Sequence, residues 1–133
     1  MRYLLIVGHA DIAKGIVSAF EMLMGPREYV VACGLTAEAG PDQYRDALAE
    51  RLAMVGAEDD VVVLADVAGG YPVRCALETL ASRGMDQRHM LVCGGANLPM
   101  MLSAVMGIDD GLGLEAIRDA LIAEGTQAIR EIV

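Results

Sequence analysis

Aromatic residues, lysine and cysteine are all scarce in this sequence. Among its 133 residues there is no tryptophan, one phenylalanine and one lysine, and acidic residues outnumber basic ones nineteen to ten, for a net charge of −9. With so few aromatic rings, the chain lacks a stacking platform for single-stranded nucleic acid. The negative net charge disfavours binding to nucleic acid and to anionic membrane surfaces, whereas it is compatible with a basic protein partner.

Long apolar runs and paired cysteines are missing as well. No run approaches the roughly 18 residues that a membrane span requires, and the first residues show no pattern of a cleaved signal peptide. The three cysteines, Cys33, Cys75 and Cys93, are widely spaced, which fits neither a disulfide framework nor a zinc site. We therefore expect a cytoplasmic protein with buried thiols.

Four apolar runs alternate with amphipathic segments along the chain. The runs are nearly continuous, which is typical of strands covered on both faces. The runs lie at 3–8, 29–35, 60–66 and 89–95, and the helical segments at 12–25, 40–56, 72–84, 98–107 and 113–133. This order predicts one α/β domain over 1–133, with a doubly wound parallel sheet of four strands and helices on both faces. The final residues, IREIV, are compatible with either the last helix or a short fifth strand.

Two polar side chains follow the first and third predicted strands. His9 follows the first strand, and Asp66 ends the third. In open parallel sheets, ligands bind beyond the carboxyl ends of the strands, and the first and third strands are usually close together there. A carboxylate beside an imidazole fixes its tautomer and leaves the other ring nitrogen free as a base or nucleophile. We therefore expect His9 and Asp66 to form a catalytic pair.

Glycine pairs follow the third and fourth strands at the same edge. Gly69 and Gly70 allow backbone N–H groups to approach an anion closely, and Asn97 opens the next helix beyond the second pair. Together with His9, they favour phosphoryl transfer through histidine, with Gly69, Gly70 and Asn97 around the phosphate. Each residue also has an ordinary structural alternative: the glycines as turn residues, and Asp66 and Asn97 as helix caps.

The remaining candidate residues favour structural roles. His89 precedes the fourth strand at the opposite edge of the sheet, where a structural or surface role is expected. The methionines of 98–106 favour the core or a protein contact. Asp109 and Asp110 are expected in a solvated turn, because no further ligand stands at a spacing suited to a metal ion.

Three blocks of sequence resemble the IIA component of the mannose-type bacterial phosphotransferase system, which covers mannose, fructose and sorbose permeases. The segment IVGHADIAKGIVSAFEMLMG is similar to the family's opening, VVVLADVAGGYPVRCA to its second block, and CGGANLPMML to its third, in which G-x-N-x-P-M opens a helix. The blocks occur in the family's order and extend over nearly the whole chain. The resemblance implies the same doubly wound parallel fold.

The resemblance also implies a role for each site residue and a set of partners. His9 matches the histidine that receives a phosphoryl group from the phosphohistidine of the carrier HPr and passes it to a IIB component, which in turn serves the membrane components IIC and IID. Asp66 matches the carboxylate that orients this histidine. No metal or organic cofactor is implied. Members are often dimeric through an exchanged C-terminal strand, so a homodimer is expected.

Three positions depart from the family pattern. Ala10 stands after the histidine where glycine is common, and Gly8 and Tyr71 occupy places where serine or threonine is frequent. No serine or threonine hydroxyl is therefore expected close to the phosphate. We expect the hydroxyl of Tyr71 to reach it from further away. Lys14 and Arg74 are the only evident cations at the rim of the site.

Three other functions share parts of this pattern. The A-type domain of the dihydroxyacetone kinase phosphotransfer protein keeps the fold and the histidine but has different partners. A response-regulator receiver would place its phosphoacceptor at Asp66, yet it needs an acidic pair after the first strand, where this chain reads GHA. A nucleotide-binding module is disfavoured because neither GxGxxG nor GxxxxGK[ST] occurs.

Overall fold

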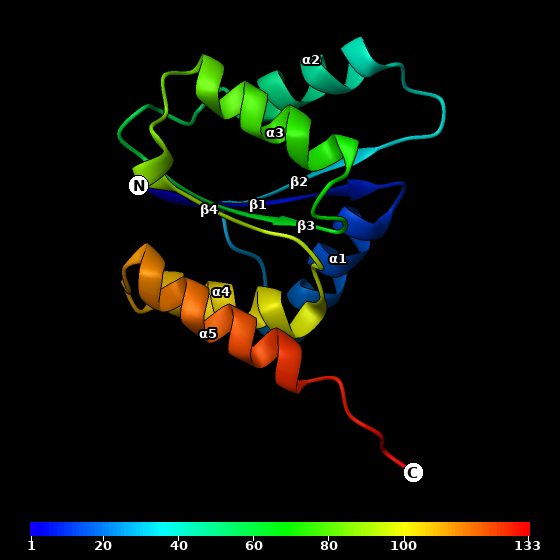
Figure 1. The fold of residues 1–133 in the computed structure, drawn as a ribbon, viewed down its shortest axis with the longest axis vertical. Coiled ribbons are helices and arrows are strands. Elements are labelled where there is room, and N and C mark those ends of the chain that lie inside the picture. The colour runs from blue at the N-terminus through cyan, green and yellow to red at the C-terminus, as the bar shows by residue number, and fades with distance from the viewer.

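The four apolar runs form one parallel sheet in the computed structural model, which describes residues 1–133 (Figure 1). The strands are ordered β2-β1-β3-β4. Their bounds are β1 Arg2–His9, β2 Val30–Leu35, β3 Asp60–Ala65 and β4 Met90–Cys93. All residues of β1 between its two ends are buried, and so is β3 after its first residue. The prediction of four parallel strands covered on both faces is confirmed.

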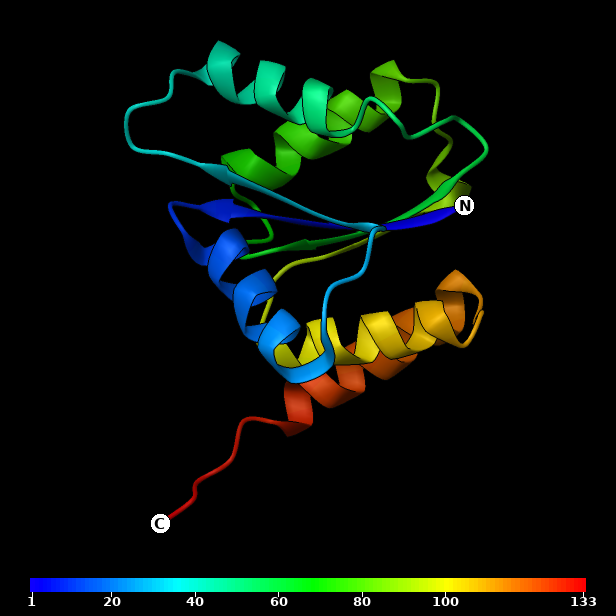
Figure 2. The ribbon, with the colours of Figure 1, turned by 180° about the vertical axis from the view of Figure 1, so that it is seen from behind.

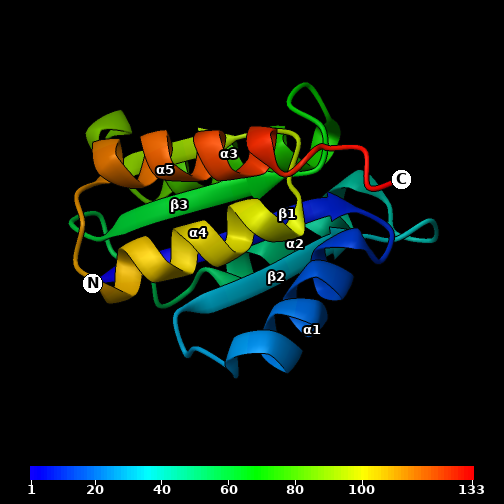
Figure 3. The same ribbon diagram turned by 90° about the horizontal axis from the view of Figure 1, so that it is seen from below.

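Helices cover both faces of this sheet, as predicted for a doubly wound fold. α2 and α3 lie on one face, while α1, α4 and α5 lie together on the other (Figures 1, 2 and 3). The bounds are α1 Ile12–Met24, α2 Pro41–Arg51, α3 Tyr71–Ser82, α4 Leu98–Asp109 and α5 Leu114–Gln127, and a short 3₁₀ helix, η1, spans Gln87–His89.

Proline and glycine determine where several helices begin and end. A proline stands in the first turn of α2, α3 and α4, where its fixed φ suits the helix and its missing N–H is not needed. Gly25 ends α1 with φ 76°, a backbone conformation that glycine adopts without strain. α2 ends at Arg51, short of the predicted end at residue 56, and the turn that follows places Leu52 and Val55 in the core.

The core consists of two clusters separated by the sheet. Successive side chains of a strand point to opposite faces, so Leu5 and Val7 of β1 pack toward α2 and α3, whereas Leu4 and Ile6 pack toward α1, α4 and α5. Both faces of the central strand are therefore buried, which keeps its carboxyl end, at His9, in one position.

The C-terminal residues 128–133 adopt neither helix nor strand. α5 ends at Gln127, and the chain then leaves the body of the molecule (Figure 1). Ile132 is 92% exposed, and Ile129 and Val133 are also exposed. The predicted helix over 113–133 is thus too long, and IREIV forms no fifth strand within this chain. None of the helices combines the length and the apolar composition that a membrane span requires.

The end of α4 corrects one expectation about its acidic pair. Asp109 is the last residue of α4 rather than part of a solvated turn, and it accepts hydrogen bonds from the Tyr29 hydroxyl at 2.6 Å and from Arg27 Nε at 3.1 Å. The hydrogen bond from Tyr29 holds the pKa of the Asp109 carboxyl below its usual value. Asp109 thereby links α4 to the segment that leads into β2.

A second histidine–aspartate pair lies at the amino ends of the strands. His89 Nδ1 is 2.8 Å from Asp60 Oδ1, and Arg2 Nη2 donates to Asp60 Oδ2 at 2.9 Å. Burial acts to raise the pKa of the Asp60 carboxyl, but the hydrogen bonds from Arg2 and His89 outweigh it and hold this pKa below its usual value. Because these residues belong to β1, β3 and η1, the cluster ties three elements together.

Replacing Asp60 by asparagine should reduce the free energy of unfolding by roughly 1 kcal/mol at pH 7. The pKa of Asp60 is lowered in the folded state, so its contribution is complete above the unfolded pKa of about 4 and is lost as the pH falls through the folded value. We therefore expect the difference in free energy of unfolding between the wild type and Asp60→Asn, measured by urea unfolding, to be smaller at pH 3 than at pH 7. Asp110→Asn, at a carboxylate with no hydrogen-bond partner, is the control; an equal loss in both variants would contradict the role of Asp60.

Candidate functional site

His9 and Asp66 lie side by side at the carboxyl edge of the sheet. His9 is the last residue of β1, Asp66 follows the last residue of β3, and the two strands are hydrogen-bonded neighbours. His9 Nδ1 is 2.9 Å from Asp66 Oδ2, and the same oxygen accepts the His9 backbone N–H at 2.9 Å. The structure therefore brings together the two residues that the sequence analysis paired.

The environment of Asp66 keeps its carboxylate ionised. Partial burial acts to raise its pKa, but hydrogen bonds from His9 and from the Val67 backbone N–H outweigh that effect, and the pKa lies below its usual value. Because an ionised carboxylate can only accept hydrogen bonds, the neutral imidazole carries its proton on Nδ1. Its Nε2 lone pair is then free, and no group of the chain hydrogen-bonds to this atom. The His9 side chain is 47% exposed, compared with 11% for Asp66.

Gly8 allows this pair to form by leaving room beside it. A Cβ atom at Gly8 would lie 2.5 Å from Ile12 Cγ2 and 3.0 Å from Asp66 Cγ. A serine or threonine there, as is frequent in the family that the sequence resembles, would displace Ile12 or Asp66. The glycine and the branched side chain of Ile12 are therefore complementary features of this chain.

The loop between β3 and α3 packs on the imidazole through Gly70 and leaves two backbone N–H groups without an acceptor. It makes a turn in which the Gly70 N–H donates to the Val67 carbonyl at 3.1 Å, whereas the N–H groups of Ala68 and Gly69 have no acceptor within the chain. Gly70 is packed so closely on the imidazole that a Cβ would lie 3.1 Å from His9 Cε1. α3 begins directly afterwards, so the positive end of its dipole lies near the histidine.

Asn97 acts as a helix cap, the alternative role considered from sequence. Its Oδ1 accepts the Met100 N–H at 3.0 Å at the start of α4. The glycine pair before Asn97 does not bind an anion through free backbone N–H groups either. The N–H groups of Gly95 and Ala96 are already used, donating to the carbonyls of Asp66 and Ala65.

Tyr71 does not supply the hydroxyl expected of it. Its Oη is buried without a hydrogen-bond partner, and its ring packs 6.3 Å from the ring of Tyr44, on the core side of α3. Arg74 lies over the Tyr71 ring, with its guanidinium carbon 5.6 Å from the ring centroid. Because the hydroxyl is buried, the expectation of a long-reach contact with phosphate is wrong.

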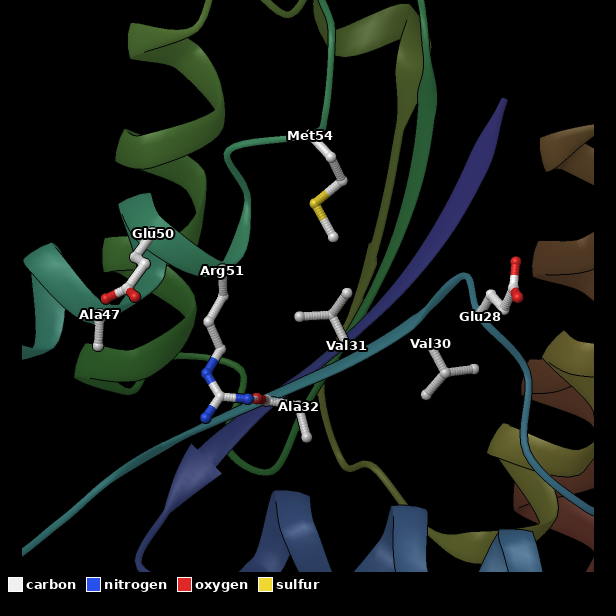
Figure 4. Close-up of a pocket in the computed structure, with 8 residues that line it drawn as sticks. All are labelled: Glu28, Val30, Val31, Ala32, Ala47, Glu50, Arg51 and Met54. Carbon is white, nitrogen blue, oxygen red and sulfur yellow. Dashed lines mark hydrogen bonds between the residues drawn. The ribbon is translucent and has the colours of Figure 1, made fainter.

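The surface around His9 is shallow and partly apolar. Ile12 is 41% exposed and Val67 is 51% exposed, and both are close in sequence to the pair. His9 lines none of the five principal hollows of the surface; the largest, of about 550 Å³, follows β2 and α2 (Figure 4). No group of three or more His, Cys, Asp or Glu side chains is placed to hold a metal ion.

Arg51 is a cation near the site that sequence reasoning missed. It lies at the end of α2, and its Nη1 donates to the Ala32 carbonyl of β2 at 2.8 Å. It lines a hollow of about 210 Å³ that Ala10 and Lys14 also line. No local pattern around Arg51 indicates this position, because the pairing of β2 with β1 brings it there.

Ala10 has a left-handed backbone, with φ 51°. It is the only non-glycine residue with positive φ, and this conformation costs a residue with a Cβ about 1–2 kcal/mol. Its N–H donates to the Leu35 carbonyl at 2.7 Å, and a Cβ at Gly34 would lie 2.5 Å from the Ala10 carbonyl oxygen. These contacts with β2 hold the strained turn directly after His9, where the family's usual glycine would be unstrained.

The fold and the site together define a class of protein: a doubly wound α/β domain whose exposed histidine is oriented by an aspartate at the carboxyl edge of the sheet. The family model described as the PTS system fructose IIA component, EIIA-man, matches residues 3–122. The chain belongs to this family of IIA components, which act in the phosphoryl relay of the sugar phosphotransferase system.

Curated relatives and solved structures agree with this membership. The chain is 26% identical to the PTS system fructose-specific EIIA component of Bacillus subtilis, covering 98% of this chain and 86% of the relative. It is 25% identical to the PTS system mannose-specific EIIAB component of Escherichia coli K12, covering 99% of this chain but spanning only 40% of that longer relative. A phosphotransferase component EIIA of Streptococcus agalactiae superposes with a TM-score of 0.83 at 25% identity, covering 98% and 97% of the two chains. The mannose/sorbose IIA subunit of Enterococcus faecalis shares the fold, with a TM-score of 0.81 at 23% identity, covering 99% and 95%.

Replacing Ala10 by glycine should stabilise the protein by roughly 0.5–1 kcal/mol. Glycine removes the left-handed strain, and the larger entropy of the unfolded chain offsets part of the gain. The measurement is the urea midpoint at pH 7. Ala49→Gly, at an exposed position in the last turn of α2, is the matched control and should destabilise by roughly 0.5–1 kcal/mol. A loss of stability in Ala10→Gly would show that the turn is not strained.

Proposed function

We propose that the protein is a phosphoryl carrier in which His9 receives a phosphoryl group from phospho-HPr and passes it to a IIB component. The observation that carries this proposal is the hydrogen bond between His9 Nδ1 and Asp66, which leaves Nε2 unbonded on a half-exposed side chain. Membership of the IIA family supports the assignment. Residues 1–133 would then form one IIA unit, and the membrane components IIC and IID would receive the group indirectly, through IIB.

The transfer would proceed by in-line attack of Nε2 on phosphorus. The Nε2–P bond forms as the N–P bond of the donor phosphohistidine breaks, and the electron pair of that bond stays on the donor nitrogen. His9 keeps its proton on Nδ1, so the phosphorylated ring is cationic, and the Asp66 carboxylate 2.9 Å away stabilises it. Transfer to the histidine of IIB reverses these bond changes. Positioning and electrostatics suffice for such a reaction, so no metal or organic cofactor is required.

The loop after β3 would bind the phosphoryl oxygens. Gly69 and its neighbour Ala68 offer N–H groups without an acceptor, and the amino end of α3 adds its dipole. Gly70 would contribute space beside His9 rather than its own N–H, which is used within the turn. Asn97 would contribute by capping α4 at the same edge.

A protein donor suits this surface better than a small molecule. His9 lies outside the principal hollows, so a free nucleotide or metabolite would have little to enclose it. Ile12 and Val67 instead present exposed apolar side chains near the imidazole, a surface that a partner protein can cover. A receiver function is disfavoured because both oxygens of Asp66 already accept hydrogen bonds from His9 and Val67.

The relay would operate in the cytoplasm. The cysteines form no disulfide, and two of the three are buried. Burial raises the pKa of the Cys33 and Cys93 thiols, which keeps both largely protonated at neutral pH. Unreactive free thiols suit a reducing compartment.

Replacing His9 by alanine should abolish phosphorylation. The wild type, incubated with phosphoenolpyruvate, enzyme I and HPr, should acquire one acid-labile phosphoryl group per chain, detected by mass spectrometry at neutral pH. His89→Ala is the matched control, since His89 also contacts a carboxylate but lies at the amino ends of the strands. It should be labelled like the wild type. Equal labelling of the His9→Ala variant would rule out the assignment.

We also propose a homodimer in which residues 128–133 of one copy pair with the sheet of the other. β4 is an edge strand with an unpaired side. A hollow of about 440 Å³ runs beside it, lined by Val92 and Cys93 of β4, by Ile122 of α5 and by Ile129 of the C-terminal segment. The exposed isoleucines and valine of the tail have the composition of a strand.

The dimer can be tested by light scattering coupled to size-exclusion chromatography. The full chain should elute with twice its mass of 14.0 kDa, and a chain ending at Gln127 should be monomeric, because it lacks the pairing segment. The control is Glu131→Ala, which keeps the backbone and the apolar side chains of the tail and should remain dimeric. A full chain that is monomeric at all concentrations, or a shortened chain that still dimerises, would refute this proposal.

A further inference from the structure

The connection between β4 and α4 packs directly on the loop that follows β3. It consists of Gly94, Gly95, Ala96 and the helix cap Asn97, and it lies at the same edge of the sheet as His9 and Asp66. We propose that Gly94 is a positioning residue: by having no Cβ, it sets the place of Ala68, and thereby of the loop that faces the histidine. The inference rests on the proposed function of His9 as the phosphoryl carrier.

The contact between Gly94 and Ala68 leaves no room for a side chain. A Cβ at Gly94 would lie 2.5 Å from Ala68 Cβ, 2.6 Å from its Cα and 2.8 Å from its backbone nitrogen. Two of these three atoms belong to the backbone, so a change of rotamer cannot relieve the overlap. Any larger residue at 94 must therefore displace the loop itself.

Hydrogen bonds fix the same two segments to each other. The Gly95 N–H donates to the Asp66 carbonyl at 3.2 Å, and the Ala96 N–H donates to the Ala65 carbonyl at 2.9 Å. Gly95 has φ 73°, which lets the chain turn toward the end of β3. A displacement of Ala68 is therefore coupled to the backbone that carries the Asp66 side chain.

The displaced segment contains the groups that the transfer would use. Ala68 and Gly69 hold the N–H groups without an acceptor, and Gly70 lies against His9 Cε1. Reacting groups must be held within fractions of an ångström, and a misplacement of about 1 Å can reduce a rate about 100-fold. Gly94 touches neither His9 nor the phosphoryl group, so it would act only through Ala68.

The test compares initial rates of phosphoryl transfer from phospho-HPr to the wild type and to Gly94→Ala. We expect a decrease of roughly tenfold or more for Gly94→Ala. Gly107→Ala is the matched control: its new Cβ would lie 2.8 Å from Ile117 Cγ1 inside the α4–α5 packing, away from His9. It should lose stability but keep the wild-type rate at a temperature where both variants are folded.

The position of Asp66 relative to His9 can be followed separately from the transfer rate by NMR, through the tautomer of the His9 ring. The ¹⁵N shifts of the His9 ring at neutral pH should show Nδ1 protonated in the wild type and in Gly107→Ala. Gly94→Ala should move toward the other tautomer, as should Asp66→Asn, which removes the carboxylate outright. If the wild type is not phosphorylated at His9, the proposed function fails, and the ring shifts alone then decide whether Gly94 positions the pair.

A second variant keeps the inference testable if Gly94→Ala does not fold. A Cβ at Gly95 would meet no atom within 4 Å, so Gly95→Ala causes no steric overlap. It strains only the left-handed backbone of residue 95, whose N–H donates to the Asp66 carbonyl. Gly95→Ala should fold, transfer the phosphoryl group more slowly than the wild type but faster than Gly94→Ala, and move the ¹⁵N shifts of the His9 ring in the same direction. The inference would be overturned if Gly94→Ala and Gly95→Ala fold, transfer at the wild-type rate and leave these ring shifts unchanged.

Discussion

The hydrogen bond between Asp66 and His9 is the interaction around which this edge of the molecule is arranged. A single oxygen, Asp66 Oδ2, accepts both the backbone N–H and the ring Nδ1 of His9, so one carboxylate fixes the end of β1 and the tautomer of its last side chain. The carboxylate can do this only because Gly8 leaves space beside it. The central place of β1 and β3 in the sheet holds the two residues in register, because buried side chains on both faces prevent either strand from shifting.

The sequence was sufficient to predict the layers of the fold and the pair at its centre. Continuous apolar runs indicate doubly covered strands, and the rule that ligands bind at the carboxyl ends of parallel strands placed His9 and Asp66 together. The prolines in the first turns of α2, α3 and α4, and Gly25 after α1, stand at helix ends because each acts through its own backbone geometry. These features follow from local pattern and from chain order, which a single sequence contains.

Features that depend on contacts between distant segments could not be predicted. The roles of the two glycine pairs differ, since Gly69 leaves its N–H free while Gly95 donates its N–H to Asp66, and nothing in the local sequence separates them. Arg51 was missed and Tyr71 was misjudged for the same reason. The packing of α2 on β2 brings Arg51 near the site, and core packing buries the hydroxyl of Tyr71. The tail was ambiguous because an apolar segment without a partner has no preferred structure of its own.

The two ends of β3 explain why a histidine–aspartate pair alone does not define a phosphoryl site. Asp60 at one end and Asp66 just beyond the other each contact Nδ1 of a histidine. At the first end, Asp60 is also paired with Arg2, and α3 finishes there with its negative pole. At the second end, α3 begins, and the loop that packs on the ring has N–H groups without an acceptor. An added phosphoryl group, which is anionic, would be stabilised only at the second end. The direction of the chain through the sheet therefore distinguishes His9 from His89.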